Sequence, residues 1–216
     1  MISVWKKILS FFWEFKLEAI YSEYSGNLEV SYFQNNYKLS TQNATYSYGK
    51  LYSSFKTAFE AIDIFNREIQ NVLILGIGLG SVIEQLNLHK TIQQIDAVDI
   101  DAQIIYLCKK YLNTNYNINY IQSDANDFIQ NCKHQYDLIL VDIFIDDQTP
   151  NKFLTENFLH QIKLICSKSC IVLFSKLNVS ELNRRENEQF GNYFSAIFPN
   201  SFSITTDGNL VFTSID

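Results

Sequence analysis

The chain has 216 residues, of which 47% are hydrophobic and 19% are charged, so it can bury a sizeable core and is too apolar for a long disordered protein. Lys and Arg number 17 against 23 Asp and Glu, and the net charge of −6 disfavours nucleic acid as a partner because its phosphate backbone is also anionic. The four cysteines form no C-x-x-C pair and lie apart from the three histidines, so we expect no metal site, no disulfide framework and a cytoplasmic location.

Residues 2–20 are rich in aromatic side chains. Lys6 and Lys7 precede the run ILSFFW, which falls far short of the ~20 apolar residues that span a bilayer, and Glu14 interrupts it. No small-residue cleavage site follows, so we predict a docked amphipathic helix, and neither a transmembrane segment nor an export signal. Attachment to a membrane surface is the alternative, because Trp and Phe side chains suit the lipid–water interface.

Residues 17–52 alternate apolar and polar side chains, with turn signals at 25–27 and 35–36. The alternation predicts a small antiparallel β appendage, and we assign residues 1–52 to an N-terminal unit of one helix and this appendage. Apolar side chains then recur at helical spacing over residues 52–65. We expect this helix to lead into a main domain that covers residues 53–216.

The main domain alternates short apolar strands with amphipathic helices. We predict parallel strands at 72–75, 95–98, 119–121, 138–141 and 171–174. Helices between them carry apolar stripes, and one of these helices is expected to run from Phe158 to Cys166. A hairpin signal at 206–209 adds two antiparallel strands at the end. The pattern predicts an α/β fold with a doubly wound, mostly parallel sheet of seven strands.

Three glycines follow the first strand of this domain, at Gly76, Gly78 and Gly80. Glycine permits a tight turn and a close approach of the backbone to a nucleoside-bearing ligand, although a plain strand-to-helix turn would also use it. Asp99 ends the next strand, 23 residues after Gly76, close to the ~20 expected for an acid that binds ribose hydroxyls. Asp101 competes for that role, but we place it in the cap of the following helix.

Acidic side chains also end the third and fourth strands. Asp124 is followed by Ala125, and its carboxylate can accept from an exocyclic amine such as that of adenine, or can cap a helix. Asp142 ends the fourth strand, and Asp146 and Asp147 follow on a loop. Beside a sulfonium-type cofactor these acids could hold a cationic amine and accept its proton, whereas the alternative is an ordinary acidic loop.

The run from residue 71 to residue 176 resembles class I S-adenosylmethionine-dependent transferases, and more narrowly the spermidine synthase (polyamine aminopropyltransferase) superfamily. The resemblance rests on the stretches GIGLGS, AVDID, QSDANDFI, YDLILVDIF and LTENFLHQIK, together with the β-rich appendage. It implies that Gly76, Gly78 and Gly80 line the methionine-derived part of the donor. It also implies that Asp99 binds the ribose and that Asp124 and Ala125 face the adenine. It also implies Asp142 as the acid that assists deprotonation of the amine, and a dimer assembled partly through the front hairpins.

The chain departs from that family's pattern at three places. Leu79 stands where the family has an Asp in the glycine loop that holds the aminopropyl amine. The family's D-S-S-D stretch runs here from Asp142 to Asp146, so the second acid comes one residue late. The family's run of tyrosine, histidine and glutamate ahead of the domain has Tyr52-Ser53-Ser54 as its nearest counterpart.

We therefore expect a transferase that uses S-adenosylmethionine or its decarboxylated form to move a methyl or aminopropyl group to a small amine-type acceptor. Asp142 and Asp146 are the candidate catalytic residues. Leu79 argues against the decarboxylated donor, because an apolar side chain cannot offset the desolvation of an ammonium group. The alternatives are a non-catalytic nucleoside-binding protein of the same fold and an NAD-dependent oxidoreductase, which shares the glycine loop and the ribose acid.

Overall fold

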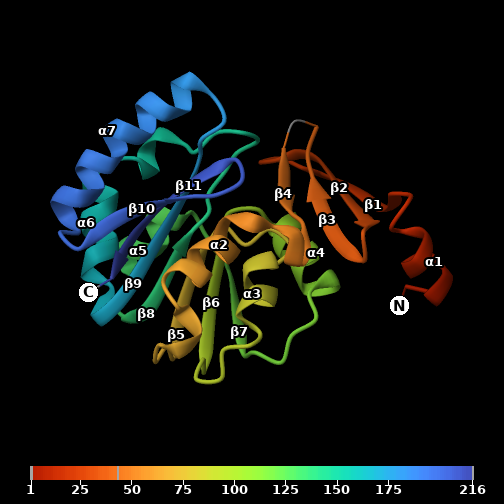
Figure 1. Ribbon diagram of the computed structural model, residues 1–216, viewed down its shortest axis with the longest axis horizontal. Coiled ribbons are helices and arrows are strands. Elements are labelled where there is room, and N and C mark those ends of the chain that lie inside the picture. The colour runs from red at the N-terminus through yellow and green to blue at the C-terminus, as the bar shows by residue number, and fades with distance from the viewer. Residues whose placement is uncertain (1, 43, 216) are drawn as a thin grey trace.

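Two β-sheets organise the computed structural model, which describes residues 2–42 and 44–215 (Figure 1). The smaller sheet is antiparallel, as predicted for the appendage, and its strands lie in the order β1-β2-β3-β4. Its strands are β1 (Phe15–Ser22), β2 (Gly26–Phe33), β3 (Asn36–Ser40) and β4 (Thr45–Ser47).

The N-terminal helix differs from the prediction of a docked amphipathic helix. Helix α1 spans only Val4–Leu9, and none of its side chains is buried. The chain enters β1 at Phe15, which pairs with Tyr32 of β2, so the strand takes residues that a longer helix would need. The segment is held through Ser10 instead, whose carbonyl oxygen accepts a hydrogen bond of 2.8 Å from the N–H of Gln34.

The larger sheet has seven strands in the order β10-β11-β9-β8-β5-β6-β7. The five strands from β9 to β7 are mutually parallel, and β11 and β10 extend the sheet antiparallel beyond β9, which confirms the predicted doubly wound sheet closed by a hairpin. The strands are β5 (Asn71–Leu75), β6 (Gln94–Asp99), β7 (Ile118–Gln122), β8 (Tyr136–Val141), β9 (Cys166–Leu177), β10 (Ser201–Thr205) and β11 (Asn209–Ile215).

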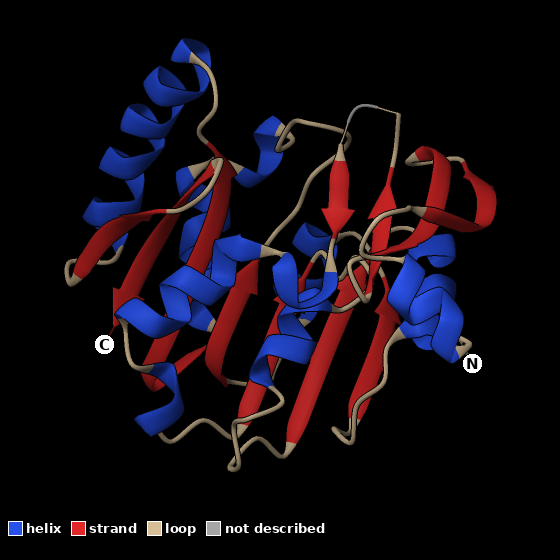
Figure 2. Ribbon diagram, turned by 45° about the vertical axis from the view of Figure 1, so that its right-hand side comes forward, coloured by secondary structure: helices blue, strands red, loops and turns tan. Residues whose placement is uncertain are grey.

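Helices cover both faces of this sheet, which is why its central strands are almost continuously apolar (Figure 2). The helices are α2 (Ser53–Ala61), α3 (Ser81–Leu86), α4 (Ala102–Tyr111), α5 (Ala125–Asn131), α6 (Glu156–Leu164) and α7 (Glu181–Ile197). Along β8, Leu138 and Leu140 pack in one apolar cluster with α2, α3 and α4, whereas Ile139 and Val141 pack in the other with α5, α6 and α7. Among the described residues, no helix has the length and apolar character needed to cross a membrane.

Two helices end earlier than the sequence pattern predicted. Helix α2 stops at Ala61, because Asp63 adopts a left-handed conformation with φ of 52° and starts a short 3-10 turn at Ile64–Asn66. Helix α6 stops at Leu164, and Cys166 begins β9 by pairing with Tyr136 of β8. Pairing within the sheet therefore takes precedence over helical periodicity at this end of α6.

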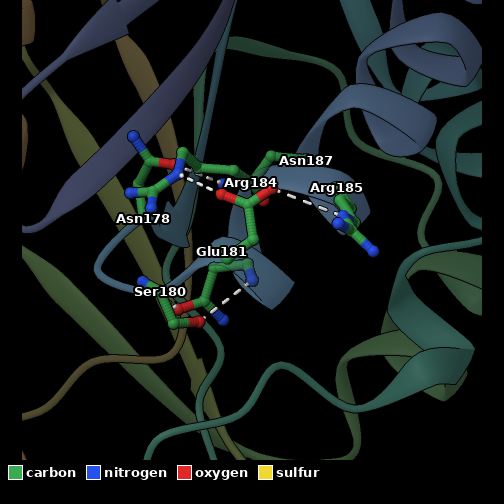
Figure 3. Close-up of polar contacts among 7 residues, drawn as sticks. Asn178, Ser180, Glu181, Arg184, Arg185 and Asn187 are labelled. Carbon is green, nitrogen blue, oxygen red and sulfur yellow. Dashed lines mark hydrogen bonds and ion pairs between the residues drawn. The ribbon is translucent and has the colours of Figure 1, made fainter.

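The start of α7 is fixed by a capping box (Figure 3). The Ser180 hydroxyl accepts from the N–H of Asn183 at 3.1 Å, and the Asn183 side chain accepts from the N–H of Ser180 at 3.2 Å. Glu181 pairs with two exposed arginines of the same helix, which adds little stability at the surface. The amide of Asn187 donates to the carbonyl oxygen of Leu177 at 2.9 Å and so ties α7 to the end of β9.

Candidate active site

A cavity of about 460 Å³ lies at the carboxyl ends of β5, β6, β7 and β8, the edge at which open α/β sheets bind ligands. The N-terminal sheet completes its wall through Tyr46 of β4 and through Tyr24 and Ser25 in the turn between β1 and β2. The lining brings together most of the site residues that the sequence predicted, namely Gly76, Gly78, Asp99, Asp124, Ala125, Asp142 and Asp146.

The glycine loop brings the backbone close to neighbouring segments. Gly76 has a φ of 86°, and a Cβ atom there would lie 2.3 Å from the carbonyl oxygen of Asp142. A Cβ at Gly78 would lie 3.0 Å from the carbonyl oxygen of Tyr46 in the N-terminal sheet. Gly80 does not line the cavity; a Cβ there would lie 2.9 Å from Leu112, so this glycine allows close packing beside α4.

Leu79 points away from the cavity. Its side chain is 5% exposed and packs in the apolar cluster with α3 and α4, and it is not part of the cavity wall. The glycine loop therefore presents no carboxylate to the cavity at this position. Acidic groups reach the cavity only from the ends of β6, β7 and β8 and from the loop after β8, among the residues that the structure describes.

Asp99 joins the end of β6 to the glycine loop. Its Oδ2 atom accepts from the N–H of Ile77 at 3.1 Å, and its Oδ1 atom accepts from the N–H of Asp101 at 2.9 Å. Burial raises the pKa of Asp99 to about 6, although these backbone hydrogen bonds oppose the rise. A carboxylate has about four acceptor positions, so Asp99 can still accept from hydroxyl groups of a ligand.

Asp101 has the structural role that the sequence predicted. Its side chain caps α4 by accepting from the N–H of Gln103 at 2.9 Å. Its other oxygen accepts from the hydroxyl groups of Ser22 and, at 2.8 Å, Ser25. Asp101 thus fixes the turn between β1 and β2, which supplies Tyr24 to the cavity wall.

Asp124 both lines the cavity and caps a helix, so its two interpretations are compatible. Its Oδ1 atom accepts from the N–H of Asn126 at 2.9 Å, which caps α5. Its Oδ2 atom forms an ion pair with Lys152, which lies after β8 and also lines the cavity.

Asp142 lies at the carboxyl end of β8, where its N–H donates to the carbonyl oxygen of Leu75 at 2.8 Å. The hydroxyl of Tyr52 donates to Oδ2 at 2.8 Å. Oδ1 is buried, and no hydrogen bond of ordinary geometry reaches it from the described residues. Burial raises the pKa of Asp142 to about 6, and the nearby hydroxyls of Tyr52 and Ser175 lower it.

Tyr52 stays neutral beside this carboxylate. Burial and the negative charge of Asp142 hold the pKa of the Tyr52 phenol well above its usual value. Its carbonyl oxygen accepts from the side chain of Gln85 on α3, which fixes the residue just before α2. The sequence pattern placed Tyr52 in the apolar stripe of a helix. The one signal of a functional role for Tyr52 was its match to the tyrosine in the tyrosine, histidine and glutamate run that the family has ahead of the domain.

The loop after β8 is bound to the N-terminal sheet. Asp146 has a φ of 55°, its carboxylate accepts from the Thr41 hydroxyl at 2.8 Å, and its N–H donates to the Tyr46 hydroxyl at 2.6 Å. Ile145 and Gln148 form a short antiparallel bridge within the loop. Asp146 therefore helps to close the cavity, and Tyr46 is a wall residue that the sequence did not indicate.

A second hollow of about 1050 Å³ follows β6 and β7 on the side of α5. It is more open, and mainly amide and other polar side chains line it, with none of the glycine loop, Asp99 or Asp142. Its buried acid, Asp96, is already bonded to the Tyr136 hydroxyl at 2.6 Å. The described residues contain no cluster of three or more His, Cys, Asp and Glu side chains that could hold a metal ion.

A mostly parallel sheet in this order, with a glycine loop after β5 and acids at the carboxyl ends of β6, β7 and β8, is the fold that this chain shares with spermidine synthases and a methyltransferase-like protein. A probable spermidine synthase from Corynebacterium glutamicum superposes with a TM-score of 0.74 over 93% of this chain and 79% of its own, at 16% identity. A spermidine synthase in complex with the transition-state analogue AdoDATO gives 0.71 over 93% and 73%, at 14% identity. Human methyltransferase-like protein 13 in complex with SAH gives 0.63 over 74% and 81%, at 18% identity.

Residues 60–206 match the spermine/spermidine synthase domain, and the chain belongs to this family. A polyamine aminopropyltransferase from Clostridium botulinum (strain Eklund 17B) is 40% identical over 83 residues, which cover 36% of this chain and 29% of that protein. One from Vibrio vulnificus is 27% identical over 158 residues, which cover 70% of this chain and 52% of that protein. The chain thus matches about half or less of the length of these curated relatives.

Proposed function

We propose that the protein is an aminopropyltransferase that uses decarboxylated S-adenosylmethionine and a small amine. In this reaction the amine nitrogen forms a bond to the donor carbon beside the sulfonium as the carbon–sulfur bond breaks. The nucleoside thioether leaves, and a proton from the attacking nitrogen passes to Asp142. The observation that carries the proposal is the carboxylate of Asp142 at the end of β8, with Tyr52 donating to one oxygen and the other oxygen unpaired among the described residues.

The state of Asp142 suits this role. A pKa of about 6 leaves the carboxylate mainly ionised at neutral pH, so it attracts an ammonium group and is basic enough to accept a proton. Asp142 lines the cavity, so a cationic acceptor bound there offsets part of the cost of burying the charge of this carboxylate. The neutral Tyr52 hydroxyl orients the carboxylate through Oδ2.

The remaining cavity residues fit the parts of a nucleoside donor. A side chain at Gly76 would collide with the backbone of Asp142, and one at Gly78 would crowd that of Tyr46. Both glycines line the cavity, where they present backbone and no side chain to a ligand. Asp99 serves as the acceptor for ribose hydroxyls, and Ala125 lies beside Asp124 where an adenine ring would contact the wall. Because Lys152 pairs with one oxygen of Asp124, adenine binding requires that this ion pair open or that the base use another contact.

Methyl transfer from S-adenosylmethionine is the second candidate, and one observation favours it. Leu79 is buried in the core, so the glycine loop offers no acid for the amine of an aminopropyl group. If the donor carries an aminopropyl group, the ammonium at the end of that group must contact another acid of the cavity wall. Asp146 and Asp147 both line the cavity. The two candidates therefore differ in the donor and share the same base.

The test is a donor competition followed by product analysis. Purified protein is incubated with each donor and a set of diamines, and mass spectrometry shows whether a product gains an aminopropyl or a methyl group. Asp142→Asn should keep donor affinity in calorimetry and lose turnover, whereas Asp207→Asn, on the exposed hairpin outside the cavity, should change neither. The proposal fails if neither donor nor its thioether product gives binding heat, or if NAD binds instead.

A further inference from the structure

Residues 4–13 form an exposed apolar surface that the site does not use, and we name it the aromatic patch. Seven of these ten residues are apolar and at least half exposed: Val4 (71%), Trp5 (75%), Ile8 (53%), Leu9 (50%), Phe11 (58%), Phe12 (80%) and Trp13 (73%). Apolar side chains gathered in this way on a surface mark an interaction site.

The aromatic patch has a defined position. The Ser10 hydroxyl accepts from the N–H of Asn35 at 3.1 Å, and the Ser10 carbonyl oxygen accepts from the N–H of Gln34 at 2.8 Å, so the turn between β2 and β3 anchors the segment. Helix α1 lies beyond the N-terminal sheet, at the opposite end of the molecule from α7 (Figures 1 and 2). None of the patch residues lines the cavity, so a partner on the patch leaves the cavity accessible.

The charge of the aromatic patch is opposite to that of the chain. Lys6 and Lys7 are its charged residues, and it contains no acid, whereas the whole chain carries a net charge of −6. The nearest acid in the sequence, Glu14, accepts from the Ser31 hydroxyl at 2.5 Å and pairs with Lys38 at 3.3 Å. Its charge is therefore engaged by the N-terminal sheet.

These features fit the surface of an anionic membrane. Trp and Phe side chains enter the boundary between headgroups and acyl chains, and lysines beside them are attracted to anionic headgroups. A second copy of the chain fits less well. A two-fold contact centred on the patch would bring Lys6 and Lys7 against their own counterparts, with no acid in the patch to neutralise them. We propose that the aromatic patch docks the protein reversibly on anionic membrane surfaces.

The proposal is tested by vesicle flotation with the full chain. Vesicles of phosphatidylcholine mixed with phosphatidylserine should carry the protein to the top of the gradient, and vesicles of phosphatidylcholine alone should carry much less. Replacing Lys6 and Lys7 by Gln should weaken binding about fivefold per lysine and reduce its salt dependence. Replacing Phe12 and Trp13 by Ser should weaken binding more than about tenfold, because large exposed apolar surfaces no longer leave water.

A matched control removes two exposed apolar side chains elsewhere. Leu182 on α7 is 66% exposed and Phe202 on β10 is 47% exposed, and their replacement by Ser should leave vesicle binding unchanged. Melting curves show that each variant is folded, and the lysine variant provides a second test if the aromatic one is not. Protein that stays at the bottom with anionic vesicles overturns the proposal. The proposal is also overturned if sedimentation shows a dimer that the patch substitutions convert to monomer, and if vesicles bind neither the dimer nor the monomer.

Discussion

Replacing Asp142 by Asn should change the pH dependence of stability in a calculable way. Burial raises the pKa of this carboxyl from 3.8 to about 6, so between these values the folded state keeps a proton that the unfolded chain has released. The folded state therefore loses stability as the pH rises through this window. The loss levels off above pH 6 at a maximum of about 3 kcal/mol, since each pKa unit corresponds to about 1.4 kcal/mol. Solvent in the cavity reduces this value.

Asn keeps the shape of the side chain and can still accept from the Tyr52 hydroxyl, but it does not titrate. Its new N–H group takes the place of an oxygen that already lacks a hydrogen-bond partner among the described residues, so one unpaired group replaces another at every pH. The informative quantity is therefore how the stability difference between variant and wild type varies with pH.

Urea unfolding near pH 5 and near pH 8 measures this difference. Relative to wild type, Asp142→Asn should gain up to about 1.5 kcal/mol between the two conditions, and Asp207→Asn should gain nothing. Turnover should be lost while donor affinity is kept. A stability difference that is equal at both pH values would refute the argument that burial perturbs this carboxyl, and retained turnover would refute its role as the base.

Three further substitutions test the neighbouring parts of the site. Tyr52→Phe removes a hydrogen bond that lowers the pKa of Asp142, so the acid limb of the pH–rate profile should move to higher pH; an unchanged limb contradicts this. Asp99→Ala should weaken binding of the donor or its thioether product by about 1–3 kcal/mol in calorimetry, and equal affinity would exclude Asp99 from the donor site. Gly76→Ala forces a Cβ to within 2.3 Å of backbone, so urea unfolding should show a loss of more than about 2 kcal/mol; near-normal stability would mean that the loop rearranges freely.

The central strands were predictable because both of their faces are buried. Stretches such as 72–75 and 138–141 are apolar throughout, so they indicate parallel strands without any knowledge of their partners. The acids at the site were predictable for a related reason. Asp99 is the last residue of one such strand and Asp142 directly follows another, and the carboxyl ends of parallel strands lie along one edge of the sheet.

The contacts between distant segments were not predictable in this way. Tyr52 reaches Asp142 across 90 residues of sequence, and no local period contains that information. The direction of Leu79 depends on a turn built from three glycines with positive φ, so neither strand nor helix alternation applies to it. The exposure of α1 was missed because its apolar residues predict burial, whereas β1 takes the following residues into the sheet at Phe15.

The long sequence separations across the cavity also govern the order in which the protein can fold during synthesis. Hydrogen bonds join the N-terminal region to residues that are made much later. Ser22 bonds to Asp101, 79 residues further along the chain, Tyr52 to Asp142, 90 residues further, and Thr41 to Asp146, 105 residues further. At about 5–20 residues per second, the ribosome takes roughly 4–20 s to supply each partner. Before β8 has joined the sheet, a nascent chain holds the glycine loop and Asp99 but has no closed donor site. The N-terminal sheet is thus made first, but its contacts across the cavity can form only after residues 101–146 have been supplied.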